Sequence, residues 1–193
     1  MKALTLITSS HRNGFTKKII DRITIGINDA EGTNEVLFLD DFDIKYCTGC
    51  RSCQKGGGCV LDDDYNKILD KIRQADYFIF TAPIFYNDIA GHSKMFLDRL
   101  GAPNYDPDLT IKPTKTLLMI THMSKNINPF VIENTHRCLA SGNFQVNKIL
   151  DIGDLMMDST LEEWVLEDYE DIGYELEEYE VIPYKLDLES ATL

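Results

Sequence analysis

The 193-residue sequence lacks any apolar run that approaches the roughly 20 residues needed to cross a bilayer. The apolar segment 2–8 is too short for the core of a signal peptide, and polar residues follow it without a small-residue cleavage site. A buried first strand is the better interpretation of this segment. We therefore expect a cytoplasmic protein that has no membrane partner.

Basic residues are also scarce, with 19 Lys and Arg against 32 Asp and Glu. The imbalance is confined to residues 151–193, which carry 15 acidic residues and one basic residue. Because binding to phosphate backbones needs a surplus of Lys and Arg, nucleic acid is excluded as a partner. We interpret the acidic segment as the solvated face of a terminal helix.

No internal repeat is present. Instead, short apolar runs alternate with segments of helical periodicity. We predict strands at 2–8, 35–39, 77–82, 116–121 and 144–152, and helices at 15–28, 65–75, 92–100, 129–140 and 161–179. This alternation predicts βαβ units and a parallel sheet, which is the α/β class. Ligands of such sheets bind beyond the carboxyl ends of the strands, so the loops after the strands are the places to search.

The loop between the first strand and the first helix combines hydroxyl groups, a guanidinium and a glycine. A helix N-terminus carries unpaired N–H groups and a partial positive charge, which suit a phosphate. The loop is neither a Gly-x-Gly-x-x-Gly dinucleotide loop nor a P-loop, and an ordinary capped turn also fits its composition. The candidate phosphate-binding residues are Ser9, Ser10, Arg12, Gly14, Phe15 and Thr16.

The loop after the predicted central strand 77–82 presents two adjacent aromatic residues among polar ones. Aromatic surface together with hydrogen-bonding groups is what a flavin ring needs. The alternative is that Phe85 and Tyr86 are core residues at the end of a strand. The candidate ring-binding residues are Pro83, Ile84, Phe85, Tyr86, Asn87 and Asp88.

Over residues 1–125 these two loops resemble those of the flavodoxin-like NAD(P)H-dependent FMN reductase family. The family's central segment reads Pro-x-Tyr and, after eight further residues, Lys-x-Phe-x-Asp-Arg. This sequence matches that segment at Pro83, Lys94, Phe96, Asp98 and Arg99, with Phe85 where Tyr is usual. It matches the family's first loop at Ser10, Arg12 and Thr16, with Ser9 in place of a Gly and His11 in place of a frequent Pro.

The resemblance implies a flavodoxin-like three-layer α/β/α sandwich with a five-stranded parallel sheet in the order 2-1-3-4-5. It also implies an FMN site that includes Thr121 and His122 of a third loop. Residues 1–158 would form the FMN-binding domain, and 159–193 an acidic helical extension of it. The protein would be a homodimer in which the long loop 101–115 and the loop with Cys47 to Cys59 contact the second subunit and help to enclose the flavin site.

The activity implied is electron transfer from NAD(P)H, the co-substrate, through FMN. The acceptor would be a quinone, a nitro or azo compound, free flavin, or an iron–sulfur cluster. No residue is predicted to be an obligatory catalytic acid or base. The alternative function is a non-enzymatic carrier that uses FMN to move electrons between protein partners.

Four of the five cysteines lie within 13 residues, as Cys47, Cys50, Cys53 and Cys59. In a reducing compartment a disulfide framework is not expected. Four thiolates in a Gly-containing loop are the ligand set of a [4Fe–4S] cluster or of a structural zinc ion. The spacing resembles that of the iron–sulfur flavoproteins, a branch of the same family, but other relatives carry similar loops without a cluster. Cluster, zinc and free thiols all remain open.

Overall fold

The computed structural model describes residues 1–153 and 163–183. Its strands are β1 (Lys2–Ile7), β2 (Thr33–Phe38), β3 (Tyr77–Phe85), β4 (Asp88–Ile89), β5 (Thr114–Thr121) and β6 (Phe144–Ile152). The α-helices are α1 (Phe15–Asp29), α2 (Tyr65–Gln74), α3 (Gly91–Leu97), α4 (Pro129–Ser141) and α5 (Glu163–Tyr174). The described residues also form three short 3-10 helices, η1 (Leu39–Asp41), η2 (Ser52–Lys55) and η3 (Pro103–Tyr105).

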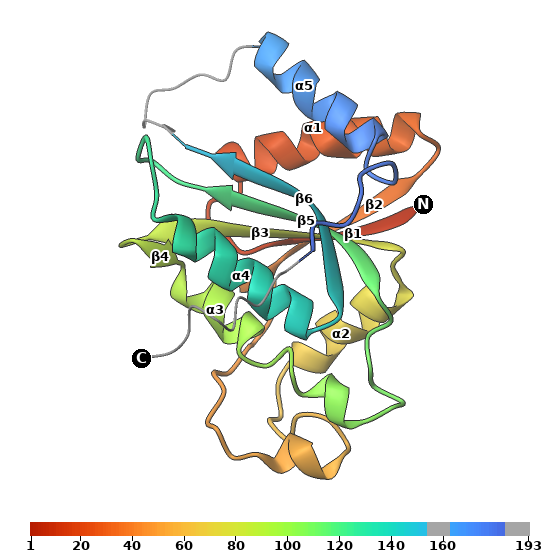
Figure 1. The fold of residues 1–193 in the computed structure, drawn as a ribbon, viewed down its shortest axis with the longest axis vertical. Coiled ribbons are helices and arrows are strands. Elements are labelled where there is room, and N and C mark those ends of the chain that lie inside the picture. Colours follow the sequence, from red (N-terminus) through yellow and green to blue (C-terminus); the bar gives the residue numbers. More distant parts are fainter. Residues whose placement is uncertain (154–162, 184–193) are drawn as a thin grey trace.

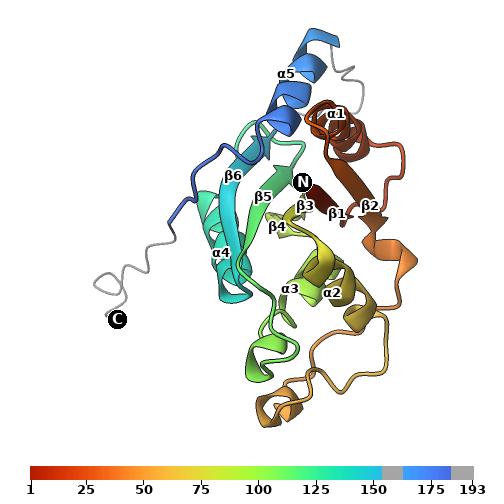
Figure 2. The same cartoon turned by 90° about the vertical axis from the view of Figure 1, so that its right-hand side faces the viewer.

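The sheet has the order β2-β1-β3-β5-β6, and these neighbouring strands are parallel. Since β4 is a short strand attached to the end of β3, this is the predicted order 2-1-3-4-5 with one extra strand. Helices cover both faces of the sheet, as Figures 1 and 2 show. The predicted flavodoxin-like three-layer sandwich is therefore confirmed.

Alternating side chains of the central strands supply the two halves of the core. Phe78 and Phe80 of β3 face α2, α3 and α4, whereas Tyr77 and Ile79 face α1. Because both faces of these strands are covered, β3 and β5 read as continuous apolar runs rather than as alternating ones. No helix in the described ranges 1–153 and 163–183 is both long and apolar enough to cross a membrane.

Helix α5 packs across α1 at a point where both helices have a glycine. A Cβ atom on Gly26 would lie 1.9 Å from the carbonyl oxygen of Glu170, and one on Gly173 would lie 2.1 Å from that of Ile23. The two glycines therefore allow the helix backbones to touch. An ion pair between Arg22 and Glu170, 2.6 Å long, lies beside this crossing.

The predicted terminal helix 161–179 is longer than α5, which ends at Tyr174. Acidic residues 175, 177 and 178 follow, and negative charge is unfavourable at the carboxyl end of a helix. Leu176 is nevertheless fully buried in the core that α1 forms with the sheet. The start of the predicted helix and the predicted boundary at residue 158 lie outside the described residues.

The predicted strand 77–82 is also corrected, because β3 continues through Pro83 to Phe85. Pro83 pairs in register with Thr121 of β5 and accepts a 2.8 Å hydrogen bond from the backbone N–H of Ala90. Tyr86 and Asn87, with φ of 51° and 69°, then form a two-residue turn into β4. A two-residue hairpin turn of this type needs positive φ at both of its residues. The loop expected after the strand is therefore a tight hairpin.

Candidate functional site

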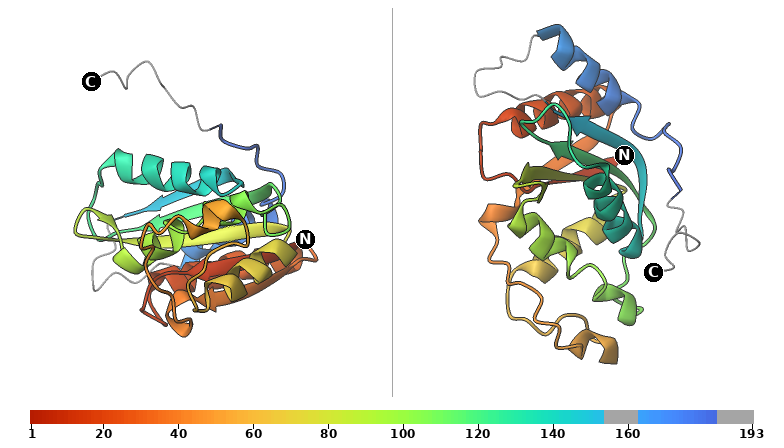
Figure 3. Two further views of the ribbon diagram at one scale, coloured as in Figure 1. Left: turned by 90° about the horizontal axis from the view of Figure 1, so that it is seen from below. Right: turned by 60° about the vertical axis from the view of Figure 1, so that its left-hand side comes forward.

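The loops after β1, β3 and β5 meet at the carboxyl edge of the sheet. The hydroxyl of Thr8, which follows β1, donates to the carbonyl of Thr81 on β3 at 2.7 Å. The hydroxyls of Thr16 on α1 and Thr121 on β5 lie 3.2 Å apart. Figure 3 shows the β3–β4 hairpin extending from this end of the sheet. The structure thus brings together the three loops that the sequence indicated.

The first loop ends at a helix N-terminus that no side chain caps. Gly14 is the N-cap of α1, no side-chain hydrogen bond is made there, and the first turn contains no acidic residue. Ser9 and Thr16 are buried beside it, whereas Ser10 is exposed and Phe15 is half-buried. Free backbone donors next to hydroxyl groups form a cradle that fits a phosphate.

Arg12, another predicted phosphate contact, is already paired. Its guanidinium donates to both carboxylate oxygens of Asp41, at 2.9 and 2.5 Å, and lies 4.4 Å from the centre of the Phe38 ring. The hydrogen bonds from Arg12 lower the pKa of Asp41. Arg12 would have to leave Asp41 to bind a phosphate with the same N–H groups, and its phosphate contact stays a prediction.

The β3–β4 hairpin exposes the aromatic residues that the sequence offered for a flavin ring. Phe85 is 52% exposed and Tyr86 is 100% exposed, so their interpretation as core residues is wrong. Asn87 and Asp88 are exposed as well, Ile84 is half-buried, and Pro83 is buried. The hairpin therefore offers uncovered aromatic surface and polar groups at the edge where the other two loops end.

His122, in the third loop, is held by a partner that sequence reasoning missed. Its side chain is 3% exposed, and its Nε2 lies 2.7 Å from Oδ1 of Asp151. The ring packs on Gly153, where a Cβ atom would lie 2.2 Å from Cε1 of the histidine. The other ring nitrogen, Nδ1, is buried and has no hydrogen-bond partner. Only the β5–β6 register, which places Ile120 beside Asp151, brings this carboxylate to the histidine.

The four clustered cysteines lie in a loop, residues 44–63, whose two ends are joined. The backbone N–H of Asp64 donates to the carbonyl of Asp43, and that of Asp43 donates to a carboxylate oxygen of Asp64, both at 2.9 Å. We call this double bridge the neck of the cysteine loop. In Figure 1 the loop projects beyond α2 and α3, away from α1 and α5.

The cysteine loop packs on the long loop 101–115 rather than standing alone. The backbone N–H of Gly57 donates to Asp106 at 2.7 Å, and Gln54 approaches the hydroxyl of Tyr105 at 3.5 Å. Ile111 is also fully buried, so part of the long loop belongs to the core and does not lie on the surface. Its predicted contact with a second subunit stays a prediction.

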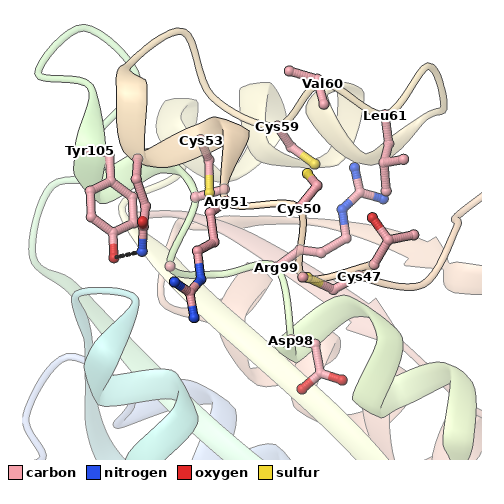
Figure 4. A pocket seen from close by; sticks show the side chains of 15 residues that line it. Cys47, Cys50, Arg51, Cys53, Cys59, Val60, Leu61, Asp98, Arg99 and Tyr105 are labelled. Atoms are coloured by element: carbon pink, nitrogen blue, oxygen red, sulfur yellow. Dashed lines mark hydrogen bonds between the residues drawn. The ribbon is translucent and has the colours of Figure 1, made fainter.

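All four predicted metal ligands line one cavity of about 230 Å³ (Figure 4). Cys47 and Cys50 are exposed, and Cys53 and Cys59 are half-buried. A hydrogen bond from Ser52 lowers the pKa of the Cys50 thiol. Within the described part of the chain, no three His, Cys, Asp or Glu side chains are positioned to hold one metal ion. The loop therefore collects the thiols in one cavity without directing them to a common centre.

Beneath this cavity lies a buried ion pair between Arg99 and Asp63, each 1% exposed. Both terminal nitrogens of Arg99 donate to the Asp63 carboxylate, and Nη1 also donates to the carbonyl of Lys45 at 3.0 Å. The guanidinium carbon lies 4.1 Å from the centre of the Tyr65 ring. Asp63, one of three consecutive aspartates, thus has a buried side chain, which the sequence did not indicate.

The comparisons with known proteins agree with this geometry. The model of the NADPH-dependent FMN reductase family matches residues 1–126. The chain belongs to this family. Among its relatives is an iron–sulfur flavoprotein of Archaeoglobus fulgidus, 26% identical over 125 residues, which are 65% of this chain and 57% of that protein. An iron–sulfur flavoprotein of Methanosarcina thermophila is 29% identical over 97 residues, 50% of this chain and 51% of the relative.

The chain spans about half the length of these curated relatives. Among solved structures, the NAD(P)H:quinone oxidoreductase from Methanothermobacter marburgensis aligns with a TM-score of 0.70 and 20% identity, covering 92% of this chain and 97% of its own. A flavodoxin from the domain Archaea aligns with a TM-score of 0.59 and 15% identity, over 92% of this chain and 97% of its own. These similarities support the fold that the family shares.

Proposed function

We propose that this chain is an FMN-dependent oxidoreductase that takes electrons from NAD(P)H and passes them through FMN to a small acceptor. One observation carries the proposal: in a member of the FMN reductase family, an uncapped helix N-terminus and an exposed aromatic hairpin meet at one sheet edge. The first feature fits a phosphate and the second fits a flat ring.

In this proposal Ser9, Ser10, Thr16 and the N–H groups at the start of α1 hold the FMN phosphate. The hairpin from Pro83 to Asp88 supports the ring, and Thr121 and His122 complete the edge. Bound FMN would supply the redox chemistry, while these side chains bind the cofactor, orient it and exclude water. Asp151 fixes the orientation of His122 and leaves its buried Nδ1 available to a ligand.

The first test concerns the phosphate cradle. Thr16→Val should weaken FMN binding about fivefold to tenfold, since it removes one hydroxyl donor to an anion. Thr24→Val is the matched control, because Thr24 lies two turns further along α1 and donates to the carbonyl of Ile20. Equal FMN affinity in both variants, measured by fluorescence titration, would argue against this cradle.

A second test separates the enzyme from the electron carrier. The purified protein with FMN should show absorbance near ~375 and ~450 nm and should oxidise NADPH in the steady state with a quinone as acceptor. A protein that takes up FMN but does not oxidise NADH or NADPH with any acceptor would favour the carrier. A protein that takes up no FMN would refute the site itself.

We further propose that Cys47, Cys50, Cys53 and Cys59 hold a [4Fe–4S] cluster. Four thiols lining one cavity have the right donor chemistry, and two of the relatives carry the name iron–sulfur flavoprotein. A bound cluster would accept single electrons. Anaerobic reconstitution with iron and sulfide should give about four irons per chain. Fewer than about one iron would leave these residues as thiols, and stoichiometric zinc in the purified protein would favour the zinc alternative.

A homodimer remains part of the proposal. It is supported by exposed apolar side chains near the candidate FMN site, namely Phe85, Tyr86, Met123 and Phe130. Sedimentation velocity should give the mass of two chains at micromolar concentration. A monomer at every concentration tested would exclude this assembly.

A further inference from the structure

The cavity beneath the cysteines contains a buried hydrogen-bond donor without an acceptor. Arg99 lines the cavity, and its Nε atom is buried and meets no hydrogen-bond partner. Buried polar atoms in native proteins are almost always paired, so an unpaired donor that lines a cavity indicates a missing ligand group. Figure 4 shows Arg99 extending into the region where the cysteine side chains gather.

The rest of the Arg99 side chain is firmly fixed. Asp63 accepts from both terminal nitrogens, and Asp63 itself accepts from the backbone N–H groups of Lys45, at 2.9 Å, and Tyr65, at 3.1 Å. The Tyr65 ring packs against the guanidinium. The guanidinium plane therefore cannot turn to satisfy Nε elsewhere, and the free N–H keeps one direction.

Cys59 and Arg99 line the same cavity, and Figure 4 draws the Cys59 side chain on the side of the cavity toward which the Arg99 guanidinium extends. A thiol sulfur is a weak acceptor, but a thiolate that ligates a metal carries negative charge and accepts hydrogen bonds more strongly. The Nε–H group is thus positioned for a negatively charged sulfur at position 59.

We propose that Arg99, oriented by Asp63, donates its Nε–H to the Cys59 thiolate of the loaded loop and thereby raises the reduction potential of the cluster. The inference rests on the cluster proposed above. Reduction adds negative charge to the cluster and its sulfur ligands, so a fixed donor stabilises the reduced form more than the oxidised form.

The test compares full-length variants reconstituted anaerobically with iron and sulfide. Arg99→Lys keeps a positive charge but has no fixed Nε–H and cannot bind Asp63 through a planar fork. At the wild-type midpoint, its ratio of reduced to oxidised cluster should fall about tenfold, which corresponds to about 59 mV for one electron. Arg51→Lys is the matched control, since Arg51 lines the same cavity but is exposed. Its ratio should change by less than about twofold.

A second variant shifts the potential in the opposite direction. Asp63→Asn keeps one side-chain oxygen that accepts from Arg99 and so holds the guanidinium, but it removes the negative charge that balances Arg99, so the ratio of reduced to oxidised cluster should rise roughly fivefold. This variant decides the matter if Arg99→Lys does not fold. Iron content, circular dichroism and redox titrations followed by electron paramagnetic resonance are measured on every variant.

The outcomes distinguish this inference from the cluster itself. About four irons in each protein, with potentials that move as stated, support the role of Arg99. If the wild type binds the cluster and Arg99→Lys has the same reduction potential, the role of Arg99 is overturned and the cluster stands. Where the lysine variant does not fold, an unchanged potential in Asp63→Asn has the same meaning. A wild type that takes up no iron overturns both.

Discussion

The two faces of the sheet differ in how completely their buried polar groups are paired. On the α1/α5 face, Tyr77 donates to Asn147, whose amide donates to the carbonyls of Leu176 and Tyr179. On the other face, next to the cysteine loop, the Tyr65 hydroxyl and Arg99 Nε have no partner. Within the described ranges 1–153 and 163–183, Tyr77 and Asn147 leave no buried side-chain polar atom without a partner. The other face keeps two polar groups that make no hydrogen bond within the described residues.

The largest expected effect comes from breaking the buried pair on the cysteine side. Arg99→Met leaves the Asp63 charge uncompensated and should lower the free energy of unfolding by about 3–5 kcal/mol, measured by urea denaturation. Asp63→Leu combined with Arg99→Met should recover much of that loss, because both charges are then gone. Arg137→Met on α4 is the control and should change stability by no more than about 0.5 kcal/mol. A double variant as unstable as the single one would contradict this account.

The helix crossing on the α1/α5 face should respond to added volume. Gly173→Ala places a methyl group against the Ile23 carbonyl and should cost about 1–3 kcal/mol of unfolding free energy, although alanine is the better helix former. Gly26→Ala should act in the same way. Gly101→Ala, where no atom lies within 4 Å of the added Cβ, should be close to neutral. A stabilised Gly173→Ala variant would mean that α5 moves away from α1 without loss.

A pair of tyrosine variants tests the contrast in hydrogen bonding directly. Tyr77→Phe leaves the Asn147 oxygen without its 2.5 Å donor and should cost about 1–2 kcal/mol. Tyr65→Phe removes a hydroxyl that has no partner and should leave stability unchanged or raise it by up to about 1 kcal/mol. Thermal and urea unfolding of the two variants measure the difference. Equal losses would show that the two faces are not distinct in this respect.

The smallest expected effect in the wild-type protein comes from the titration of Asp63 at low pH. Burial opposes its ionisation, but hydrogen bonds from Arg99 and from the backbone of Lys45 and Tyr65 outweigh it and lower its pKa below 3.8. The stabilisation is complete above the unfolded-state value and is lost as the pH falls through the lowered folded-state value. Between pH 7 and pH 3 the free energy of unfolding should therefore fall less steeply in Asp63→Asn than in the wild type. An equally steep fall in both proteins would assign the loss of stability at low pH to other carboxyl groups.

The sequence predicted the strands and the loops of the site because apolar runs report directly on buried strands, and the resemblance to the family implied the strand order. It missed the β3–β4 hairpin, since Tyr86 and Asn87 adopt positive φ without glycine. It gave no partner for Asp63, which is the second of three consecutive aspartates. The partner of Asp63 lies 36 residues away, and only the tertiary structure brings Arg99 to it. Asp151 was missed for the same reason, because strand register decides its contact with His122.

The neck at Asp43 and Asp64 has a consequence for whether the cysteine loop can be replaced by another segment. Since the neck already holds its two ends together, the 20-residue segment 44–63 can be exchanged as a unit while the rest of the fold stays in place. A shorter turn, or a segment with other ligands, can replace it without altering the register of the sheet or the flavin edge. Arg99 would have to change with it, because Asp63, the buried counter-ion of Arg99, belongs to the exchanged segment.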